Sequence, residues 1–276
     1  MTRVPIADLD KLFAATPPPD GLAWLHDQSR LSNAVRRRRK MPELGTRIID
    51  VGSGLGQVAA DLAASFPQVA EVIGLDADPL ATLYAQEWTR TLDLPLQFLT
   101  ADLYHWLPDI PVTGITCRFV LQHLSDVPGA LRQFYRWLEP GGMLLIEDVD
   151  EGYSVDWPPF PLAWIKALEA FMAHQNRKGG DREVGRKLGP GLLDAGFQAM
   201  ATVEVATQTS VLAYDDPSLS WIRQRIEMFI PAFQKEGLLT ASGWADAKAA
   251  LAEWLPRPVY QSSASVVWVA QKPVKP

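Results

Sequence analysis

The amino-acid sequence predicts an α/β fold with a doubly wound, mostly parallel sheet. Three observations support this. Short runs of Val, Ile and Leu alternate with helical segments of about ten residues, as in sheets covered by helices on both faces. The first such run, Arg47–Val51, is followed at once by a glycine-rich turn. Two later runs each lead directly into an aspartate, Asp76 and Asp102.

Composition limits the class of protein. With 47% hydrophobic and 21% charged residues, the 276-residue chain can bury a full core. A net charge of −6 and a pI near 5.3 argue against nucleic acid as the main partner. The single cysteine, Cys117, excludes an internal disulfide and a cysteine-based zinc cluster, and we expect no metal. No apolar run reaches the roughly 18 residues of a membrane span and the start lacks a signal-peptide core, so we expect a cytoplasmic protein without membrane contact.

The first half of the chain divides into alternating elements. Residues 1–20 hold short apolar pieces that end at three prolines, and Gly21–Met41 is expected to form one helix. The basic run from Arg36 to Lys40 at its end is interpreted as solvated, with phosphate or RNA contact as the alternative. The expected strands are Arg47–Val51, Glu71–Asp76, Leu96–Ala101, Ile115–Val120 and Met143–Val149, and the expected helices between them are Gln57–Phe66, Pro79–Leu92 and Pro128–Leu138.

The second half is less regular. We expect irregular helices over residues 151–190, a helix that ends at Gly196, a strand at Ala201–Leu212, helices from Asp216 to Leu255 and a last strand at Ser263–Lys272. This gives three expected parts: an N-terminal helical cap (residues 1–45), a core that binds a nucleoside cofactor (46–150), and the remainder of the sheet with helical insertions over the substrate (151–276).

The end of the first strand has the composition of a nucleoside site. Gly52 and Gly54 lack Cβ atoms where the chain turns and a ligand can touch the backbone, and Gly56 lets the next helix approach the sheet. Asp76 can accept both hydroxyl protons of a ribose, and Asp102 ends the neighbouring strand near an adenine amino group.

A dinucleotide dehydrogenase is the main alternative, because it shares the strand, the turn and the acid. Its fingerprint places a third glycine where this chain has Gln57. The sequence therefore favours a nucleoside without a diphosphate.

Together these segments resemble class I S-adenosylmethionine-dependent methyltransferases of the small-molecule branch. The resemblance rests on IIDVGSGLGQ, GLDADP, TADL, CRFVLQHLSD and LEPGGMLLIED, which follow in order over residues 48–148. It implies a Rossmann-like, seven-stranded sheet whose last strand is inserted antiparallel, a place that Ser263–Lys272 suits. This chain departs from the family at Val112-Thr113-Gly114, where relatives often have an aspartate, and at Ser53 in the glycine turn.

The resemblance also implies roles for individual residues around S-adenosylmethionine. Gly52, Ser53 and Gly54 would contact its methionine and ribose parts, Asp76 the ribose, and Ala77 the adenine. Asp102 and Leu103 would bracket the adenine amino group, and Arg118 and Phe119 would offer backbone to the methionine amine. Arg30, on the N-terminal helix, could meet the methionine carboxylate.

The candidates for chemistry lie after the fourth and fifth strands. His123 is the candidate general base, with helix capping or a backbone contact as the alternative. Tyr153, Asp148 and Asp150 could orient an acceptor or be ordinary loop residues. A set of large aromatic residues is expected to fill the core of a helical lid, with two or three facing the ligand: Trp157, Phe160, Trp164, Phe171, Trp221, Phe229, Phe233, Trp244 and Trp254.

The expected activity is methyl transfer from S-adenosylmethionine to an oxygen, nitrogen or carbon atom of a small hydrophobic or aromatic acceptor, in secondary (natural-product) metabolism. S-adenosylhomocysteine would be the product. The alternative is a non-catalytic regulatory or partner subunit that binds the cofactor. The sequence identifies neither the acceptor nor the oligomeric state, and a homodimer stays open.

Overall fold

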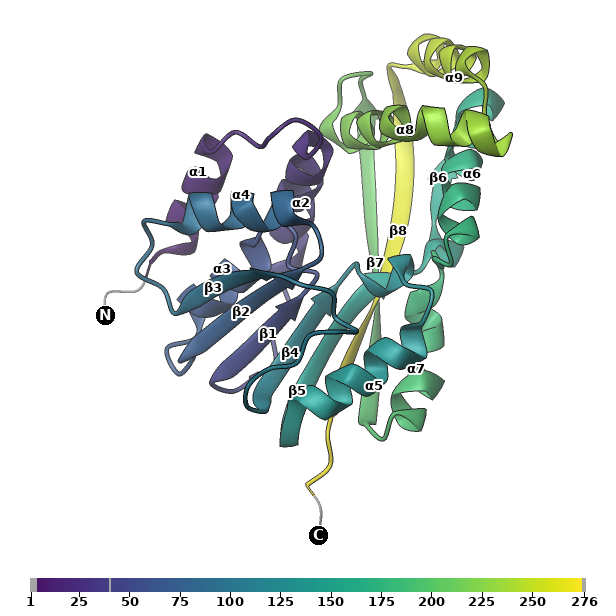
Figure 1. Ribbon diagram of the computed structural model, residues 1–276. Helices are drawn as coiled ribbons and strands as arrows, with labels where there is room; N and C mark the ends of the chain where they lie inside the picture. The colour runs from purple at the N-terminus through teal and green to yellow at the C-terminus, as the bar shows by residue number, and fades with distance from the viewer. Residues whose placement is uncertain (1–3, 40, 275–276) are drawn as a thin grey trace.

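A computed structural model describes residues 4–39 and 41–274, apart from the side chains of residues 34, 35, 206, 208, 218 and 221. Its centre is one twisted sheet in the order β3-β2-β1-β4-β5-β8-β6, with β7 also paired to β8 (Figure 1). The strands are β1 Arg47–Val51, β2 Glu71–Asp76, β3 Leu96–Thr100, β4 Val112–Arg118, β5 Leu138–Val149, β6 Val155–Trp157, β7 Gln198–Leu212 and β8 Arg257–Gln271.

Strands β1 to β5 pair in parallel, and β8 runs antiparallel beside β5. The expected place of the last strand is therefore confirmed. The expected number of strands, seven, is wrong for the described chain, which has eight. The three-residue β6 was too short to register as a separate apolar run.

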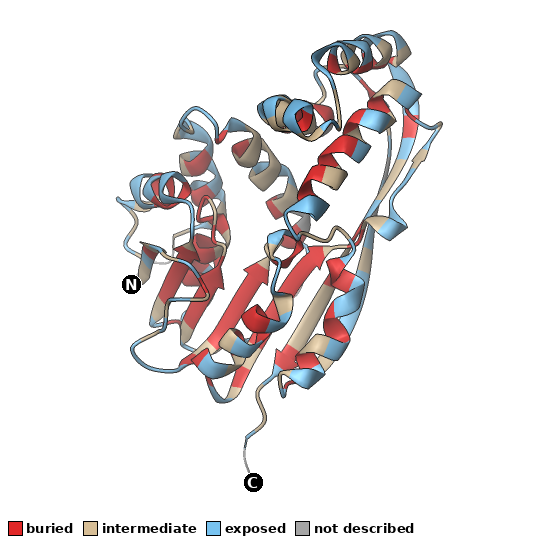
Figure 2. Ribbon diagram, turned by 45° about the vertical axis from the view of Figure 1, so that its right-hand side comes forward, coloured by how far each residue is buried: buried red, intermediate tan, exposed pale blue. Residues whose placement is uncertain are grey.

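Helices cover both faces of the sheet, as expected for a doubly wound fold. Ile49 packs in one core cluster with α5 and α7, and the adjacent Ile48 points to the opposite face, in a cluster with α3. Figure 2 shows buried residues gathered in the strands and on the inward faces of the helices. The helices are α1 Ile6–Ala15, α2 Ala23–Arg36, α3 Gln57–Ser65, α4 Pro79–Thr89, α5 Val127–Trp137, α6 Leu162–Arg177, α7 Val184–Asp194, α8 Pro217–Glu236 and α9 Ala241–Trp254, with short 3₁₀ turns η1 Leu121–His123 and η2 Glu151–Tyr153.

Several elements differ from the sequence-based expectation. Helix α1 was not expected; it buries Leu9 and Phe13 and packs against α3. Helix α2 ends at Arg36 rather than Met41. Strand β5 begins at Leu138, so the expected proline-glycine turn lies inside the strand, where the pairing with β4 shifts register.

Helices α6, α8 and α9, here called the helical insertion, lie at the far ends of the long strands β7 and β8 (Figure 1). They have their own apolar core, which confirms the expectation that most of the aromatic residues fill such a core. The buried aromatic members are Phe160, Trp164, Phe171, Phe233 and Trp244, with Phe229 and Trp254 partly buried against them. Trp157 is 69% exposed, and the side chain of Trp221 lies outside the described set. None of the helices described is long and apolar enough to cross a membrane.

The basic run after α2 is not a solvated helix end. Arg36 is buried and pairs with Asp61 of α3, and Arg37 binds both Asp61 and Asp10. Arg39 pairs with Glu147 of β5 and with Glu204 of β7. The expectation is wrong at these three arginines because buried carboxylates on neighbouring elements meet them. Arg38 is exposed, and Lys40 lies outside the described residues.

Gly56 confirms its expected packing role. Its φ is +82°, and a Cβ atom there would lie 2.6 Å from Phe98 Cζ and 2.8 Å from Ala85 Cβ. We therefore expect Gly56→Ala to lower the free energy of unfolding by about 2–5 kcal/mol, from backbone strain and overpacking together. Gly21→Ala is the control, because Gly21 has φ +89° and nothing within 4 Å of the added atom. Equal losses in urea unfolding would contradict the packing role.

Candidate active site

A cavity of about 450 Å³ opens at the carboxyl ends of β1 to β4, beneath α2. This volume is in the range of small-molecule sites, and this edge of a parallel sheet is where ligands bind. All the expected residues of the glycine turn and the strand ends line it: Gly52, Ser53, Gly54, Asp76, Ala77, Asp102, Leu103, Arg118 and Phe119. The structure therefore brings the two acids and the turn together.

The glycine turn forms the floor of the cavity. Gly52 and Gly54 have φ values of +64° and +51°, which disfavour other residues. A Cβ atom on Gly52 would lie 2.2 Å from Val120 Cγ2, whereas one on Gly54 would meet nothing closer than Leu25 Cδ2 at 3.9 Å. Gly54 therefore leaves room beside the backbone. The Oγ atom of Ser53 is buried without a hydrogen-bond partner among the described residues.

Asp76 is held in place by backbone amides. Its Oδ2 accepts a hydrogen bond from the Gly54 nitrogen at 2.7 Å, and its Oδ1 accepts one from the Asp78 nitrogen at 2.9 Å. Burial raises the pKa of Asp76 above its ordinary value, although these amides act in the opposite direction. Each carboxylate oxygen can still accept a further hydrogen bond from a ligand.

Asp102 lies beside Asp76 because β2 and β3 are paired up to their last residues. The Ala101 nitrogen donates to the Asp76 carbonyl oxygen at 2.8 Å, which continues the pairing into the loop. Asp102 itself is exposed, and its Oδ1 accepts from the Tyr104 nitrogen at 2.8 Å. Leu103 is 9% exposed and adds an apolar side chain to the lining of the cavity.

Helix α2 supplies a wall of the cavity through residues that the sequence analysis did not name. Its lining residues are Trp24, Leu25, Gln28, Ser29, Ser32 and Asn33. Most are three or four positions apart, which places them on one helix face. This polar spacing was a usable signal. Arg30 is exposed and does not line the cavity, so the structure gives no support to its expected contact with a carboxylate.

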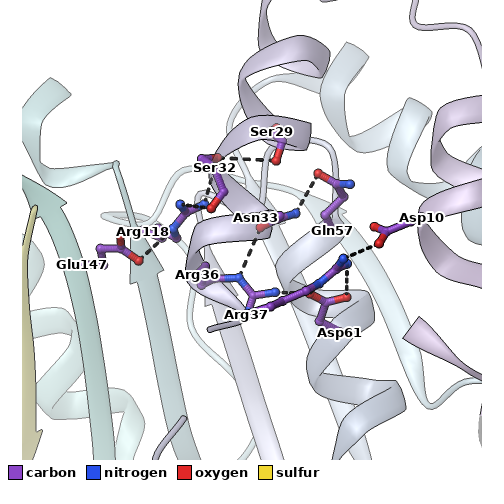
Figure 3. A network of polar contacts seen from close by, with 10 residues as sticks. All are labelled: Asp10, Ser29, Ser32, Asn33, Arg36, Arg37, Gln57, Asp61, Arg118 and Glu147. Atoms are coloured by element: carbon purple, nitrogen blue, oxygen red, sulfur yellow. Dashed lines mark hydrogen bonds and ion pairs between the residues drawn. The ribbon is translucent and has the colours of Figure 1, made fainter. Parts of the chain in front are cut away.

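A network of polar contacts fastens α2 over the cavity (Figure 3). Asn33 Nδ2 donates to Gln57 Oε1 at 2.7 Å, which ties α2 to α3. Arg118 Nε donates to Glu147 Oε2 at 2.9 Å, and its Nη2 donates to the Ser32 carbonyl oxygen at 3.2 Å. Burial alone would raise the pKa of Glu147, but Arg118 and Arg39 together hold it below its ordinary value. The ion pairs of Asp61 with Arg36 and Arg37 complete this network.

The chain bends sharply after β4. Phe119 has φ +57°, a left-handed conformation that is uncommon outside glycine. Its nitrogen donates to the Glu147 carbonyl oxygen at 2.8 Å, and its carbonyl oxygen accepts from Gln122 Nε2 at 3.2 Å. Such strain persists where the surroundings enforce it, often at functional sites. The bend sends η1 along one end of the cavity.

His123 lines that end of the cavity, and its ring opens into the space. Its Nδ1 lies 3.2 Å from Gln175 Nε2, which also donates to the Gln122 carbonyl oxygen at 2.9 Å. Because the Gln175 amide is oriented as a donor, Nδ1 accepts and the ring proton sits on Nε2. Desolvation at this end of the cavity, with the nearby charges of Arg225 and Arg182, lowers the pKa of His123 to about 3. His123 is therefore neutral and presents a hydrogen-bond donor.

The residues expected after β5 do not line the cavity. Tyr153 is 47% exposed and lies under Arg186, with 5.0 Å between the guanidinium carbon and the ring centroid. Asp150 is buried and pairs with Arg186, and Asp148 accepts hydrogen bonds from the backbone of Val149 and Gln122. These side chains hold the loops around the site.

No insertion aromatic whose side chain is described lines the cavity, so the expectation that two or three of them face the ligand stays a prediction. The aromatic residues that line the cavity are Trp24, Tyr104 and Phe119, none of which belongs to the insertion. The insertion aromatics pack instead against one another; for example, the rings of Trp164 and Trp244 lie 5.8 Å apart.

Asp148 gives a testable pH dependence. Burial raises its pKa to about 7, from an ordinary value near 3.8. The folded protein therefore holds this proton more tightly than the unfolded chain does. The resulting stabilisation is present at low pH and is lost as the pH rises from about 4 to about 7.

Relative to the wild type, Asp148→Asn should therefore gain stability across this window and level off above it. Urea unfolding of both proteins at several pH values measures the difference. A difference that stays constant with pH would contradict this assignment.

The donor set suits an adenosine derivative rather than a metal. Within residues 4–39 and 41–274, no group of three His, Cys, Asp or Glu side chains could hold a metal ion. The cavity instead combines a fixed carboxylate, an apolar wall and a glycine turn with an unpartnered Ser53 hydroxyl. These features match the hydroxyls, the base and the chain of a nucleoside bearing an amino acid.

Comparison with known proteins decides the family. Residues 49–146, which include the glycine turn, both acids and the end of β4, match a family profile described as "Methyltransferase domain". The chain therefore contains a methyltransferase domain, similar to those of class I S-adenosylmethionine-dependent methyltransferases. The sequence-based resemblance is thereby confirmed.

Relatives of this methyltransferase carry different names. The chain is 28% identical over 193 residues to phosphoethanolamine N-methyltransferase 3 of Arabidopsis thaliana, covering 70% of this chain and 36% of the relative. It is 32% identical over 133 residues to demethylmenaquinone methyltransferase of Thermus thermophilus, covering 46% of this chain and 56% of that relative. The chain thus spans about a third of the first relative and about half of the second.

A solved structure supports the fold of the whole methyltransferase chain. Phosphoethanolamine N-methyltransferase 2 of Haemonchus contortus, in complex with phosphomonomethylethanolamine and S-adenosylhomocysteine, is similar with a TM-score of 0.50 and 18% identity. The similarity covers 97% of this chain and 57% of that one. At this identity the likeness concerns the fold alone.

Proposed function

We propose that the protein binds S-adenosylmethionine in the cavity beneath α2 and transfers its methyl group to a small-molecule acceptor. S-adenosylhomocysteine is the second product. The observation that carries the proposal is the convergence of the glycine turn, Asp76 and Asp102 on one cavity. The match to a methyltransferase domain supports the same assignment.

We assign the cofactor contacts as follows. The free lone pairs of Asp76 accept the two ribose hydroxyls, and Ala77 and Leu103 flank the adenine while Asp102 meets its amino group. Gly52, Ser53 and Gly54 lie along the ribose and the methionine chain, and the Ser53 hydroxyl gains a partner there. The backbone of Arg118 and Phe119 faces the methionine amine. On this assignment residues 46–150 bind the cofactor, and residues 1–45 and 151–276 supply the walls.

When bound, the cofactor supplies a methyl group on a positively charged sulfur. A nucleophilic atom of the acceptor would take this methyl group in line, and S-adenosylhomocysteine would be the leaving group. The protein contributes alignment and exclusion of water, which can account for much of the rate. Helix α2 closes the site, and we assign His123 Nε2 as a donor that orients the acceptor rather than as the general base. The proton lost from an oxygen or nitrogen acceptor then passes to solvent.

We propose a small molecule as the acceptor. The relatives do not identify it, because phosphoethanolamine and demethylmenaquinone differ in size and polarity. Trp24 and Leu124 offer apolar contact in the cavity, and Gln28 and His123 offer polar contact. This lining favours an acceptor that combines an apolar or aromatic body with polar groups. A place in secondary metabolism rests on the sequence resemblance.

Calorimetry with S-adenosylmethionine and S-adenosylhomocysteine tests the proposal, and we expect micromolar binding of both. Incubation of the protein with a metabolite extract and methyl-labelled cofactor should then yield a labelled small molecule. If S-adenosylmethionine does not bind at millimolar concentration, the proposal is wrong. Binding without any labelled product would favour the non-catalytic subunit.

A further inference from the structure

Arg225, on α8 of the helical insertion, is a buried cation without an anionic partner. It is 8% exposed, lines the cavity, and its Nε has no hydrogen-bond partner. Within the described part of the chain, no carboxylate lies at ion-pair distance from it. Its guanidinium carbon instead lies 4.5 Å from the ring centroid of Trp24 and 4.8 Å from that of Phe171.

These aromatic contacts do not neutralise the charge. The free energy that a cation gains over an aromatic face is smaller than the free-energy cost of burying an unpaired charge. Burial, together with nearby Arg182, lowers the pKa of Arg225 to about 9, although Glu151 acts in the opposite direction. Arg182 is itself paired with Glu151. Arg182 and Arg225 carry two positive charges, whereas Glu151 carries one negative charge. One positive charge is therefore left without a partner at this end of the cavity.

The charge faces the end of the cavity remote from the adenine contacts. Arg225 is close enough to His123 to lower its pKa, and its other charged neighbours, Arg182 and Glu151, lie beyond the end of β5. Asp102 lies at the opposite side of the sheet edge, after β3. Because the strand order runs β3-β2-β1-β4, the cofactor assigned above reaches from Asp102 to Phe119 and leaves the part of the cavity beside His123 and Arg225 for the acceptor.

We propose that Arg225 binds an acidic group, a carboxylate or a phosphate, on the methyl acceptor. This inference rests on the proposed function and specifies its substrate class. A guanidinium donates two parallel hydrogen bonds to either group, and the Trp24 and Phe171 rings packed against this guanidinium lower the local polarity and strengthen them. The flat Trp24 ring beside the charge suits an acceptor with an apolar body and an acidic end.

The test uses protein loaded with S-adenosylhomocysteine and calorimetry with two probes. Benzoate is compared with benzamide, which has the same shape without the charge, and inorganic phosphate is compared with chloride at equal ionic strength. We expect at least one anion to bind tenfold or more tightly than its control. Benzoate binding indicates a carboxylate acceptor, and phosphate binding indicates a phosphate ester.

Arg225→Met should weaken anion binding at least tenfold and leave the affinity for S-adenosylhomocysteine within threefold. Because it removes an unpaired buried charge, its Tm without ligand should equal or exceed that of the wild type. Arg225→Lys keeps the charge but not the paired donors, and should retain part of the binding. Arg223→Met is the matched control, since Arg223 lies two positions away, stacks on Tyr214 and does not line the cavity.

The proposal is overturned if neither anion binds the loaded wild type, or if Arg225→Met binds the anion as the wild type does. It is also overturned if Arg225→Met loses S-adenosylhomocysteine in the same proportion, because Arg225 would then serve the carboxylate of the cofactor. Failure of the wild type to bind S-adenosylhomocysteine would instead contradict the proposed function.

Discussion

Asp76→Asn is expected to weaken binding of S-adenosylhomocysteine by about 100-fold. Hydrogen bonds to a charged group contribute about 1.5–3 kcal/mol each, and the carboxylate is assigned two ribose hydroxyls. A loss of about 3 kcal/mol corresponds to roughly two factors of ten. The substitution also turns an amide NH₂ toward the nitrogen of Gly54 or Asp78, where the carboxylate accepts a hydrogen bond. Calorimetry measures the dissociation constant.

The control for this variant is Asp78→Asn. This substitution makes the same change of charge two residues away. Asp78 caps α4 by accepting a hydrogen bond from the Leu80 nitrogen, and it does not line the cavity. Its affinity should stay within threefold of the wild type. Similar losses in both variants would show a general electrostatic effect rather than a ribose contact.

The raised pKa of Asp76 adds a pH signature to the same experiment. Only the ionised carboxylate accepts both hydroxyl protons, so wild-type affinity should fall as the pH is lowered toward that pKa. Asp76→Asn should lack this fall.

Asp61→Asn is expected to lower the free energy of unfolding by about 3–5 kcal/mol, the usual cost of breaking a buried ion pair from one side. Asp61 is 4% exposed, and it meets the guanidinium groups of both Arg36 and Arg37. Removing its charge leaves Arg36 without an ion-pair partner among the described residues and leaves Arg37 with Asp10 alone. Urea unfolding provides the measurement.

Asp10→Asn serves as the comparison. Asp10 also pairs with Arg37, at 2.6 Å, but its side chain is 49% exposed. An exposed pair contributes about 0–1 kcal/mol, so this variant should stay close to the wild type. A loss below about 1 kcal/mol for Asp61→Asn would show that the network in Figure 3 does not fasten α2.

Local sequence patterns were sufficient to predict that the first five strands exist and in what order. Glu71–Asp76 was predicted at its observed bounds, because a β-branched run between turn residues has few alternatives. Helix α1 was missed because ten residues with two buried apolar side chains, Leu9 and Phe13, form a weak period. Their burial depends on α3 and α4, which lie far along the sequence.

The strand-end residues of the site were predictable for a topological reason. Parallel strands bring their carboxyl ends to one edge, so Asp76 and Asp102 had to lie close together once the strands were identified. The wall from α2 and the charge of Arg225 depend on how helices dock. No local sequence pattern predicts that α8 packs against α2.

The basic run and the insertion aromatics illustrate the same limit. Arg36 and Arg37 look solvated in sequence because their partner, Asp61, lies on another helix. The dense aromatics after residue 156 were read partly as a ligand pocket, but residues such as Trp164 and Phe233 complete the core of the insertion. Composition indicates that such side chains are buried, and only the packing shows against what.

The most direct test of the account is a crystal structure of the protein with S-adenosylhomocysteine. We expect the ribose hydroxyls at the Asp76 carboxylate, the adenine between Ala77 and Leu103, and the sulfur near the bend at Phe119, facing His123 and Arg225. A ligand bound elsewhere, or a ribose that does not touch Asp76, would contradict the account.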